Sequence, residues 1–502
     1  MTVPGVLLEL RPGMPLLFGG NRVTYVSEAL ARAFEPGDRL IVVQTTGDIL
    51  HIPAAQQQIA DTAVGRAREA FADLRTLPEE RAERFYDEFG SRLADDGIWS
   101  KVVAANDDDV VRARARGRST TRLLITPSMR NRMLDGLGRW RAMVPSRYRT
   151  TERVEHMGWK VEQVRDGVGV VGFVFEGRPN VLVDATGILR TGNTTALRIG
   201  SDALGTARVL VSLALAPALA AAGLPEGAVT LIESTEHAAG WALFANTGLS
   251  LAIARGSGAT VEQLGAIARQ AGVPVSLHGT GGAWMIVDET AEPAYLRSVV
   301  YHSLDRKVCN TLNVACFVEA SVETLLPVFL AAVAARGTQL GHGYKLHVTP
   351  DAMPYVPHEL FERSTTVVRA GGPADEPIAE PWDVQALGHE WEWERTPEVT
   401  VHITKDVDEA VGLFNQHSPR FIASLISQDQ EIHDRFFRSI DAPFVGNGVT
   451  RWVDGQFALN RPELGLTNWQ HGRLLSRGGI LTGDGVYTLR LRVHQTDPEV
   501  HQ

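Results

Sequence analysis

The sequence is poor in cysteine, carries no excess of positive charge and has no long hydrophobic run. Only Cys309 and Cys316 occur in 502 residues, which excludes a disulfide framework and favours the reducing cytoplasm. The most apolar stretch, Val209–Leu224, is too short to span a bilayer and contains Pro217. The start shows no secretion signal, and the net charge of −10 argues against nucleic acid as the main partner. We therefore expect a cytoplasmic protein with neither a membrane nor a nucleic acid among its partners.

What the sequence does contain is a long alternation of strands and helices. Its 502 residues, 44% hydrophobic and 22% charged, suffice for two or three globular domains. Apolar runs of strand length alternate with helical segments such as Asp202–Ala222 and Thr260–Ala271, which predicts a parallel sheet covered on both faces. The predicted strands of this first set are Val168–Phe175, Ala196–Ile199, Val229–Ile232, Leu251–Ala254, Val273–Leu277 and Trp284–Val287.

A second alternating set follows Cys309 and predicts a second α/β domain. Its strands are Val314–Val318, Val399–Ile403, Phe421–Ser427 and Phe444–Val445, and its helices are Val322–Ala335, Val407–Gln416 and Gln430–Ile440. Ahead of both sets, helical spacing of apolar residues predicts the helices Gln56–Leu74, Pro78–Ala94, Asn106–Arg116 and Pro127–Trp140.

Other segments stand outside this alternation. The first 53 residues contain strand-like runs at Val6–Leu10 and Leu40–Gln44 and form a small appended element. Gly371–Pro381 is rich in Pro, Gly and acidic residues and is predicted as a loop. Trp382–Trp393 is an aromatic and acidic patch to which the sequence assigns no role. The tail Gly485–Gln495 alternates residues as an exposed strand does.

Cys309 is the candidate nucleophile. It lies in the polar, partly basic segment Asp305–Asn313, just before an apolar run. Nearby Arg306 and Lys307 favour the thiolate, which is the reactive form of the side chain. The alternative is that Cys309 is an ordinary intracellular cysteine. Cys316 lies inside the apolar run and is predicted to be a core residue.

Polar turns after predicted strands are candidate ligand sites. Arg178 and Asn180 follow the first predicted strand, at the edge where open α/β sheets hold ligands. Arg198–Asp202 joins a short strand to a long helix through Gly200 with a Ser/Asp cap, and Arg255–Gly258 repeats this strand–Gly–helix pattern. A helix start of this kind can bind a cofactor phosphate on its backbone N–H groups, although capping turns without a ligand are common.

Taken together with Cys309, these segments resemble the γ-glutamyl phosphate reductase (glutamate-5-semialdehyde dehydrogenase) family, a branch of the aldehyde dehydrogenase superfamily. The likeness runs in order over roughly residues 55–495. The family stretches YEARPNVTVDA, SGNAVILRGG, IPRGG and VCNALETLL resemble Phe175–Ala185, Thr191–Gly200, Ala254–Gly258 and Val308–Val314. The family stretches STRFTDG, GAEIGIST and HARGPMGL resemble Val449–Gly455, Pro462–Thr467 and Leu475–Leu481.

The resemblance implies both a fold and a set of site residues. The implied fold is aldehyde dehydrogenase-like α/β, with a Rossmann-type cofactor domain, an α/β catalytic domain and a small oligomerisation strand element. Cys309 would form a thioester with the acyl group, while Asn180 and the Cys309 backbone N–H would stabilise the oxyanion. NADPH is the implied cofactor, with NADH as the alternative, and no metal ion is expected. The implied cofactor-binding residues are Arg198, Gly200, Ser201, Gly256, Ser257 and Glu463, and the implied substrate-binding residues are Arg178, Asn310, Arg451 and Arg477. Among these, Glu463 would hold the nicotinamide ribose, and Arg198 with Ser201 would line the adenosine side.

The expected domains follow from the same resemblance. Residues 1–53 are an extension of unknown role, 54–300 the cofactor-binding domain, 301–447 the catalytic domain, and 448–502 a return to the cofactor domain ending in an oligomerisation strand. The strands around Trp159–Val164 and Gly485–Val493 alternate like exposed edges. Such strands extend sheets across subunits in this superfamily, so we expect a homodimer or homotetramer.

One difference from hydrolytic aldehyde dehydrogenases bears on the reaction. Those enzymes carry a Glu in a LELGG stretch as the base that activates water, whereas the corresponding Leu277–Gly282 holds no carboxylate. Hydrolysis of a thioester should therefore be slow, which favours exchange with phosphate and hence acyl-phosphate reduction. His278 is either a structural turn residue or a phosphate contact.

Departures from the family pattern leave the acyl substrate open. The CNALET Glu is Asn313 here, GVCHVYVD has become Gly282–Asp288, and GISTQKLHARG is rewritten as Gly465–Gly478. The leading interpretation is NADPH-dependent reduction of an acyl phosphate, by default the γ-glutamyl phosphate of proline biosynthesis. The alternatives are a relative that acts on another activated acyl group or aldehyde in a specialised pathway, and an inactive scaffold that keeps the fold for assembly or partner binding.

Overall fold

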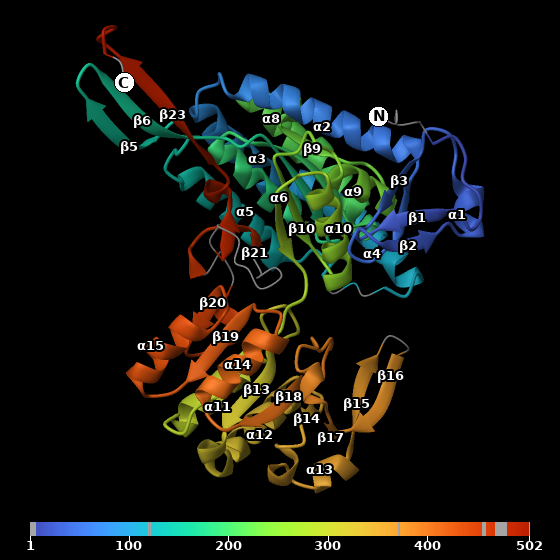
Figure 1. Ribbon diagram of the computed structural model, residues 1–502, viewed down its shortest axis with the longest axis vertical. Coiled ribbons are helices and arrows are strands. Elements are labelled where there is room, and N and C mark those ends of the chain that lie inside the picture. The colour runs from blue at the N-terminus through green and yellow to red at the C-terminus, as the bar shows by residue number, and fades with distance from the viewer. Residues whose placement is uncertain are drawn as a thin grey trace. The chain divides into compact units, whose positions relative to one another are not determined.

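The computed structural model describes residues 7–118, 120, 122–369, 372–453, 458–466 and 479–500, and they form two compact units (Figure 1). Unit 1 holds the described residues up to Gly279, Leu459–Leu466 and the described residues from Ile480 onward, and unit 2 holds the described residues of Thr280–Ala458 together with Gly479. The chain therefore passes from unit 1 to unit 2 after Gly279, and segments near its C-terminal end belong to unit 1 again.

The expected boundary at residue 300 needs correction. Strand β12 (Ala283–Val287) and helix α11 (Pro293–Ser303) belong to unit 2. The reason is that β12 pairs on one side with β13 (Leu312–Val318) and on the other with β19 (Ile422–Ile426), both strands of unit 2. A buried apolar run in the sequence does not reveal which sheet it will join.

Unit 1 is built on a five-stranded parallel sheet in the order β11-β10-β7-β8-β9. The chain runs outward from β7 through β8 to β9 and then starts again on the other side of β7, so the strand order reverses at β7. In open α/β sheets, ligands bind beside the carboxyl ends of the strands at such a reversal. The strands are β7 (Val170–Phe175), β8 (Thr194–Ile199), β9 (Val229–Leu231), β10 (Leu251–Arg255) and β11 (Val275–His278).

Helices cover both faces of this sheet, because successive strand residues point to opposite sides. Val171, Phe173 and Phe175 of β7 join one hydrophobic core, whereas Val170 and Val174 join another. The first core includes residues of α3 (Glu80–Ala94), α4 (Asp96–Ala115), α5 (Pro127–Ala142) and α6 (Val181–Ala185), and the second includes residues of α2 (Ala54–Leu74), α9 (His237–Phe244) and α10 (Gly258–Gln270).

The predicted helix Asp202–Ala222 is interrupted. It begins as a 3₁₀ turn at Ser201–Ala203 and continues as α7 (Leu204–Leu210), a π-helical turn at Val211–Leu215 and α8 (Ala216–Ala222). Pro217 has no N–H to donate to the preceding turn, and the π-helical turn ends two residues before it, at Leu215. The stretches Ser201–Ala222 and Glu319–Gln339 are long and apolar enough to cross a membrane, but each contributes buried residues to a core of its own unit.

The described part of the N-terminal extension packs on unit 1. Its elements are β1 (Pro15–Phe18), β2 (Arg22–Tyr25), α1 (Glu28–Ala33), β3 (Arg39–Val42) and β4 (Ile49–Ile52), with antiparallel pairs β1–β2 and β3–β4. Leu50 and Ile52 are buried in the same core as α2 and α9. The prediction of a strand at Val6–Leu10 is wrong for Leu7–Leu10, which have no regular structure.

A three-stranded antiparallel sheet in the order β23-β6-β5 extends from unit 1 (Figure 1). Its strands are β5 (Thr150–His156), β6 (Trp159–Asp166) and β23 (Thr488–Gln495). The prediction that the segment around Trp159 is an edge is wrong, since β6 is the central strand and the edges are β5 and β23. Two further short strands of unit 1, β21 (Glu463–Leu466) and β22 (Ile480–Thr482), pair with each other.

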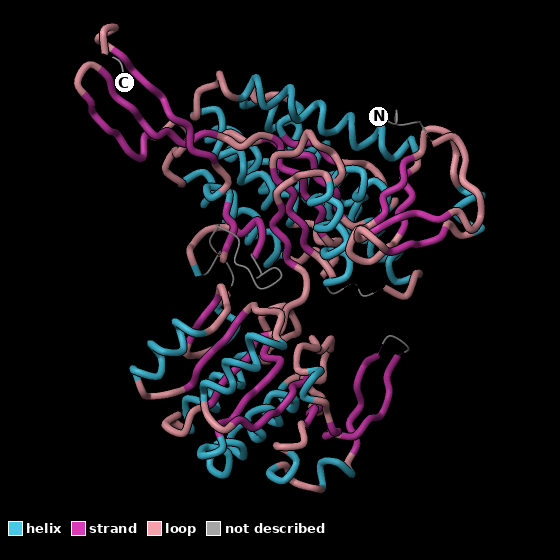
Figure 2. Tube along the Cα trace, viewed as in Figure 1, coloured by secondary structure: helices cyan, strands magenta, loops and turns pink. Residues whose placement is uncertain are grey.

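Unit 2 is built on a seven-stranded parallel sheet in the order β17-β14-β18-β13-β12-β19-β20, with helices packed on both faces (Figure 2). Beyond the strands already given, it contains β14 (Lys345–Val348), β17 (Ala379–Pro381), β18 (Glu398–Thr404) and β20 (Phe444–Gly446). Its remaining helices are α12 (Val322–Gln339), α13 (Glu359–Glu362), α14 (Val407–His417) and α15 (Gln430–Ser439).

The segment predicted as a loop at Gly371–Pro381 is instead partly strand. Its described residues include β16 (Gly372–Pro377), which pairs antiparallel with β15 (Ser364–Arg369), and the edge strand β17. Proline is tolerated in an edge strand because the missing N–H does not break a ladder on the open side. Composition alone therefore suggested a loop where the chain forms two short edge strands.

Candidate active site

Cys309 lies on the loop between α11 and β13, and its environment differs from that of the other cysteine. Its side chain is partly exposed, whereas Cys316 on β13 is fully buried. Burial raises the pKa of the Cys316 thiol, so this side chain stays protonated and inert. The Cys309 carbonyl accepts a hydrogen bond from the Gly282 N–H at 2.7 Å. The prediction that Cys316 is a core residue is confirmed.

The backbone at Gly281 packs directly on Cys309. A Cβ atom at position 281 would lie 2.5 Å from the Cys309 carbonyl oxygen and 2.6 Å from its Cα. Any side chain there would push the nucleophile loop away, so only glycine fits. On the loop itself, the Thr311 hydroxyl donates to the Arg306 carbonyl at 2.7 Å and accepts the Val308 N–H at 2.9 Å. The Cys309 loop is therefore held by internal contacts on both sides.

Two of the predicted substrate residues, Asn310 and Arg451, contact each other and have further partners within unit 2. The Asn310 side chain is buried and donates to the Val453 carbonyl at 2.6 Å, while its oxygen accepts from Arg451. Arg451 also pairs with Asp305 at 2.6 Å. The nitrogen and the oxygen of the Asn310 amide are thus both hydrogen-bonded to other residues of the protein. The third, Arg178, lies in unit 1, and Arg477 lies outside the described residues.

A cluster of charged residues lies at the carboxyl edge of the sheet of unit 1. Glu176 follows β7 and pairs with Arg178 at 2.6 Å and with Arg122 at 2.7 Å. Arg255 ends β10 and pairs with Glu463 of β21 at 2.9 Å. The fold thus brings Glu463, distant in sequence, to the predicted ligand edge at the point where the strand order reverses.

The charges in this cluster set the protonation of its members. Burial alone would raise the pKa of Glu176, but Arg178 and Arg122 hold it below its usual value. His278, which ends β11 in the same edge, has its pKa lowered to about 4, first by burial and then by Arg255. His278 is therefore neutral near pH 7 and supplies no positive charge to a phosphate.

The turn after β8 depends on a close backbone approach. A Cβ atom at Gly200 would lie 2.7 Å from the Gly177 nitrogen, so a side chain there would separate the ends of β7 and β8. Arg198 is buried, which lowers the pKa of its guanidinium. One of its amino groups donates to the Thr235 carbonyl at 3.2 Å, and its Nε has no hydrogen-bond partner among the described residues. The Ser201 hydroxyl lies 3.4 Å from Arg118.

The helix that follows this turn is capped from another element. One carboxylate oxygen of Asp109, on α4, accepts both the Thr206 N–H and the Thr206 hydroxyl at 2.7 Å. The expected Ser/Asp cap is wrong, because neither Ser201 nor Asp202 makes a side-chain cap and Asp202 pairs with Arg118 at 2.8 Å. A carboxylate of the chain itself thus lies at this helix start, and no local sequence pattern predicts it.

The second strand–Gly–helix turn is different. Ser257 is the N-cap residue of α10 but makes no side-chain cap hydrogen bond, and its hydroxyl lies 3.0 Å from that of Thr260. Gly256 donates its N–H to the His278 carbonyl at 3.2 Å. The first-turn N–H groups of α10 therefore fit an anionic group better than those of α7.

The predicted oxyanion donor Asn180 lies in unit 1, at the start of α6. Its side-chain amide donates to Asp184 at 3.2 Å. Cys309 lies in unit 2. The contact with Asp184 orients the Asn180 amide within its own unit, and its catalytic role stays a prediction.

Sequence reasoning missed the carboxylate that neighbours the nucleophile loop. Glu390, from the aromatic and acidic patch, pairs with Lys307 and accepts the Gly281 N–H. The expectation that Lys307 favours the Cys309 thiolate stays a prediction, and Glu390 offsets part of the charge of the Lys307 ammonium group. Only the folded structure reveals this pair, since the two residues are far apart in sequence.

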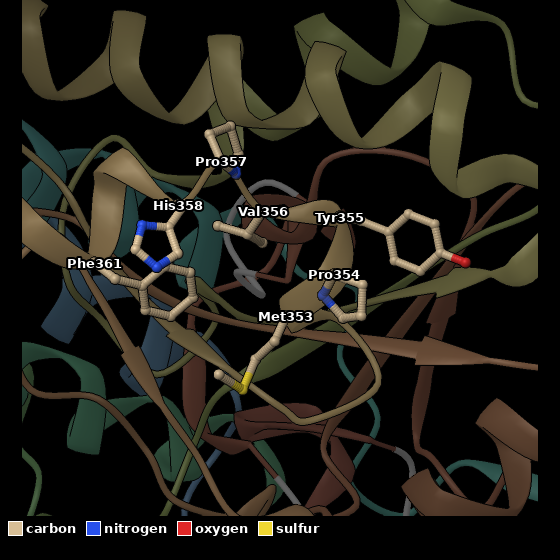
Figure 3. A pocket seen from close by; sticks show the side chains of 7 residues that line it. All are labelled: Met353, Pro354, Tyr355, Val356, Pro357, His358 and Phe361. Atoms are coloured by element: carbon tan, nitrogen blue, oxygen red, sulfur yellow. The ribbon is translucent and has the colours of Figure 1, made fainter.

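A hollow of about 590 Å³ opens elsewhere on unit 2. Figure 3 shows that its lining side chains all come from one continuous surface segment, between β14 and β15. The titratable residues in this lining are Tyr355 and His358, and the His358 side chain is largely exposed beside Glu362. None of the predicted site residues lines the hollow, so we do not assign it to the reaction.

Comparisons with known proteins agree with this arrangement. The model of the aldehyde dehydrogenase family matches residues 164–371. A γ-glutamyl phosphate reductase of Rhizorhabdus wittichii is 30% identical over 390 residues, which cover 76% of this chain and 82% of that protein. One of Bradyrhizobium sp. (strain ORS 278) is 27% identical over 454 residues, which cover 88% and 95%.

Solved structures share the fold. The γ-glutamyl phosphate reductase of Thermotoga maritima has a TM-score of 0.75 at 23% identity, over 88% of this chain and all of that chain. An acetylating aldehyde dehydrogenase of Geobacillus thermoglucosidasius has a TM-score of 0.62 at 13% identity, over 89% and 99%. Two α/β units with a cysteine loop ahead of a buried strand thus define an aldehyde dehydrogenase fold. Within it, the chain belongs to the γ-glutamyl phosphate reductase branch of the aldehyde dehydrogenase family.

Proposed function

We propose that this chain is a cytoplasmic oxidoreductase that reduces an acyl phosphate, by default γ-glutamyl phosphate, to the semialdehyde with NADPH. The observation that carries the proposal is the place of Cys309. It is partly exposed on a loop before the buried strand β13, and Gly281 and Gly282 pack against its backbone. In this proposal unit 1 binds the cofactor and unit 2 carries the nucleophile.

The proposed reaction forms and breaks one covalent bond to sulfur. The Cys309 thiolate attacks the acyl carbon, and phosphate leaves with the electron pair of the C–O bond. The side-chain amide of Asn180 and the Cys309 backbone N–H donate to the oxygen that gains charge. The hydride that reduces the thioester carbon comes from the nicotinamide cofactor when it is bound. Collapse of the resulting oxyanion then releases the aldehyde and restores the thiolate.

Residues of unit 1 fit a nicotinamide dinucleotide. Ser257 and Gly256 would hold the pyrophosphate at the start of α10, where no side chain caps the helix. Arg198 and Ser201, with Gly200 between them, would line the adenosine side, and the unpartnered Nε of Arg198 supports an anionic or polar ligand there. Glu463 would hold the nicotinamide ribose. NADPH is preferred over NADH in this proposal because of the family resemblance.

Resistance of the thioester to water supports a phosphate-linked reaction. Leu277–Gly282 contains no carboxylate, and Glu390 is a carboxylate that contacts this segment. One Glu390 oxygen accepts the Gly281 N–H and the other pairs with Lys307, so both oxygens are already engaged. His278 is neutral but buried. We therefore propose that phosphate, and not water, exchanges with the acyl group.

The test is oxidation of short semialdehydes with both nucleotides, with and without phosphate. Without phosphate we expect one equivalent of reduced nucleotide to form as a burst and then stall at the Cys309 thioester. Adding phosphate should restore steady turnover. Steady production of free acid in phosphate-free buffer would contradict the acyl-phosphate reaction and indicate a hydrolytic aldehyde dehydrogenase.

A second candidate is a reductase of another activated acyl group. It is favoured by Asn313, which replaces the Glu of the family motif and hydrogen-bonds the backbone on both sides of Glu390. The same screen separates the two candidates, because a relative with a different substrate would use glutamate semialdehyde poorly and another aldehyde well.

A further inference from the structure

The aromatic and acidic patch Trp382–Trp393 is tied to the nucleophile loop through one asparagine. Asn313, on β13, donates its side-chain amide to the His389 carbonyl at 2.7 Å and accepts the Trp391 N–H at 2.9 Å. A single buried side chain thus holds the backbone on both sides of Glu390. The position of Glu390 is therefore set from the same strand that follows Cys309.

Trp391 anchors the patch on its other side. Its ring is buried and stacks on His347 of β14, with ring centroids 3.3 Å apart, and its Nε1 donates to the Thr400 hydroxyl at 2.8 Å. Because Trp391 is packed against two strands of the sheet, the segment that carries Glu390 has little room to move.

Glu390 uses this fixed position to contact the nucleophile loop at two points. One oxygen accepts the Gly281 N–H at 2.5 Å, and the other pairs with the Lys307 ammonium. The side chains of Lys307 and Glu390 are only 6% and 14% exposed, so solvent screens the pair weakly. Gly281 in turn packs on the backbone of Cys309.

We propose that Glu390 is a positioning residue for Cys309. It holds the Gly281 backbone against the nucleophile loop and offsets the charge of Lys307, two positions before the nucleophile. Asn313 and Trp391 keep it in place. The proposal rests on the proposed function, in which Cys309 is the nucleophile, and it gives a role to both the patch and the Asn313 departure.

Other charged groups near Lys307 and Cys309 are differently placed. Glu392 lies 4.0 Å from the Lys307 ammonium, but its side chain is 75% exposed. Asp305 is paired with Arg451, and Arg306 precedes Lys307 in the chain. Glu390 is therefore the buried partner of Lys307, and Glu392 is a matched carboxylate at the surface.

The first measurement is the rate of Cys309 alkylation by iodoacetamide as a function of pH, in a Cys316→Ala background. In Glu390→Gln the charge of Lys307 is no longer offset. The pH at which alkylation reaches half its maximal rate, called the midpoint here, should therefore fall by about one pH unit. In Lys307→Met the carboxylate remains alone, so the midpoint should rise by about one pH unit. The double variant should return close to the parent.

The second measurement is kinetic. Glu390→Gln should lower kcat by about tenfold, because a loosened loop misplaces the nucleophile, while the dissociation constant of NADP⁺ stays within about twofold. Glu392→Gln is the control and should change neither the midpoint nor kcat, because an exposed pair contributes little. If Glu390→Gln does not fold, Lys307→Met and the double variant carry the same test.

Equal midpoints in the parent and both single variants, or shifts in the same direction, would overturn the proposal. So would an effect of Glu392→Gln as large as that of Glu390→Gln. Alkylation needs no substrate. Opposite shifts in a protein that reduces no acyl phosphate would therefore support the positioning role and contradict the proposed function alone.

Discussion

At the scale of the residue, environment separates side chains that are identical in the sequence. The chain has two cysteines, of which Cys316 is fully enclosed by β13 and its neighbours while Cys309 is partly exposed on a loop. Histidines differ in the same way. His278 is buried beside Arg255, whereas His358 lies at the surface. Reactivity and protonation therefore follow from burial and neighbouring charge.

The two cysteines should respond differently to substitution. Cys309→Ala or Cys309→Ser should abolish turnover and leave nucleotide binding nearly unchanged, because only the covalent step is lost. Cys316→Ala should keep activity but lower the free energy of unfolding by about 1 kcal/mol, as a small core truncation does. Turnover, nucleotide titration and thermal melting of the three variants check this. If the Cys309 variants kept activity and Cys316→Ala lost it, the assignment of Cys309 as the nucleophile would be wrong.

His278 should make stability depend on pH. Its folded pKa of about 4 lies below the usual 6.5, so between these values the unfolded chain binds a proton that the folded protein does not. The stabilisation is complete above pH 6.5 and is lost progressively as the pH falls toward 4. At pH 5 the loss should be about 2 kcal/mol relative to pH 7.

The control for this prediction is His278→Gln, which cannot titrate. Denaturant unfolding of both proteins at pH 7 and pH 5 gives the difference due to His278 alone. Burial also lowers the pKa of His347 and His402, so both proteins should lose stability in acid, but the parent should lose more. Equal losses would show that His278 is protonated in the folded protein.

At the scale of the element, two similar turns have different partners. The helix after β8 receives Asp109 from α4 at its first turn, whereas α10 starts without a side-chain cap. The turn after β8 is instead defined by the contact of Gly200 with Gly177. The same strand–Gly–helix sequence pattern therefore leads to two different helix starts in the fold.

Gly200→Ala should disturb the carboxyl edge of the sheet. The added Cβ would lie 2.7 Å from a backbone nitrogen, so β7 and β8 must move apart, at a cost of about 1–3 kcal/mol. We expect a lower melting temperature and about tenfold weaker NADP⁺ binding, measured by calorimetry.

Gly65→Ala is the matched control in the same unit. Gly65 lies inside α2, and no atom lies within 4 Å of its added Cβ. This variant should raise stability by about 0.5–1 kcal/mol, because alanine is the better helix former. A Gly200→Ala protein as stable as the parent would show that the two strand ends can separate without cost.

At the scale of the whole molecule, one surface of unit 1 leaves apolar side chains exposed. On β23, Arg490 and Arg492 pair with carboxylates of β6, whereas Leu491 and Val493, on the opposite face, are 69% and 57% exposed. Val154 of β5 is 43% exposed in the same row as Val493. An apolar face on a sheet with open edges is a liability in a monomer. We therefore propose a homodimer or homotetramer.

Leu491→Lys should weaken this assembly. Light scattering of the unmodified protein should give a multiple of the 54.7 kDa chain mass, and the variant should shift toward the monomer as the protein is diluted. Leu17→Lys, on an equally exposed residue of the N-terminal extension, should leave the mass unchanged. A mass near that of one chain for the unmodified protein at every concentration would refute the proposal.

Much of the fold could be predicted because local pattern and buried strands agree. The runs at Val170–Phe175 and Leu251–Ala254 are apolar throughout because both faces of these strands are covered. The helices Ala54–Leu74 and Pro127–Ala142 begin and end near the predicted residues. The family resemblance was found in the motifs around Asn180, Cys309 and Glu463, and this resemblance predicted the class of reaction.

What the sequence alone determined is therefore the local structure, the family and the candidate nucleophile. Only the tertiary structure decided which sheet takes β12, that Asp109 caps the helix after β8, and that Glu390 meets Lys307 and Gly281. The physical reason is the range of each interaction. Periodicity and turn chemistry act between residues a few positions apart, whereas strand pairing and buried ion pairs join residues that only the folded chain brings together.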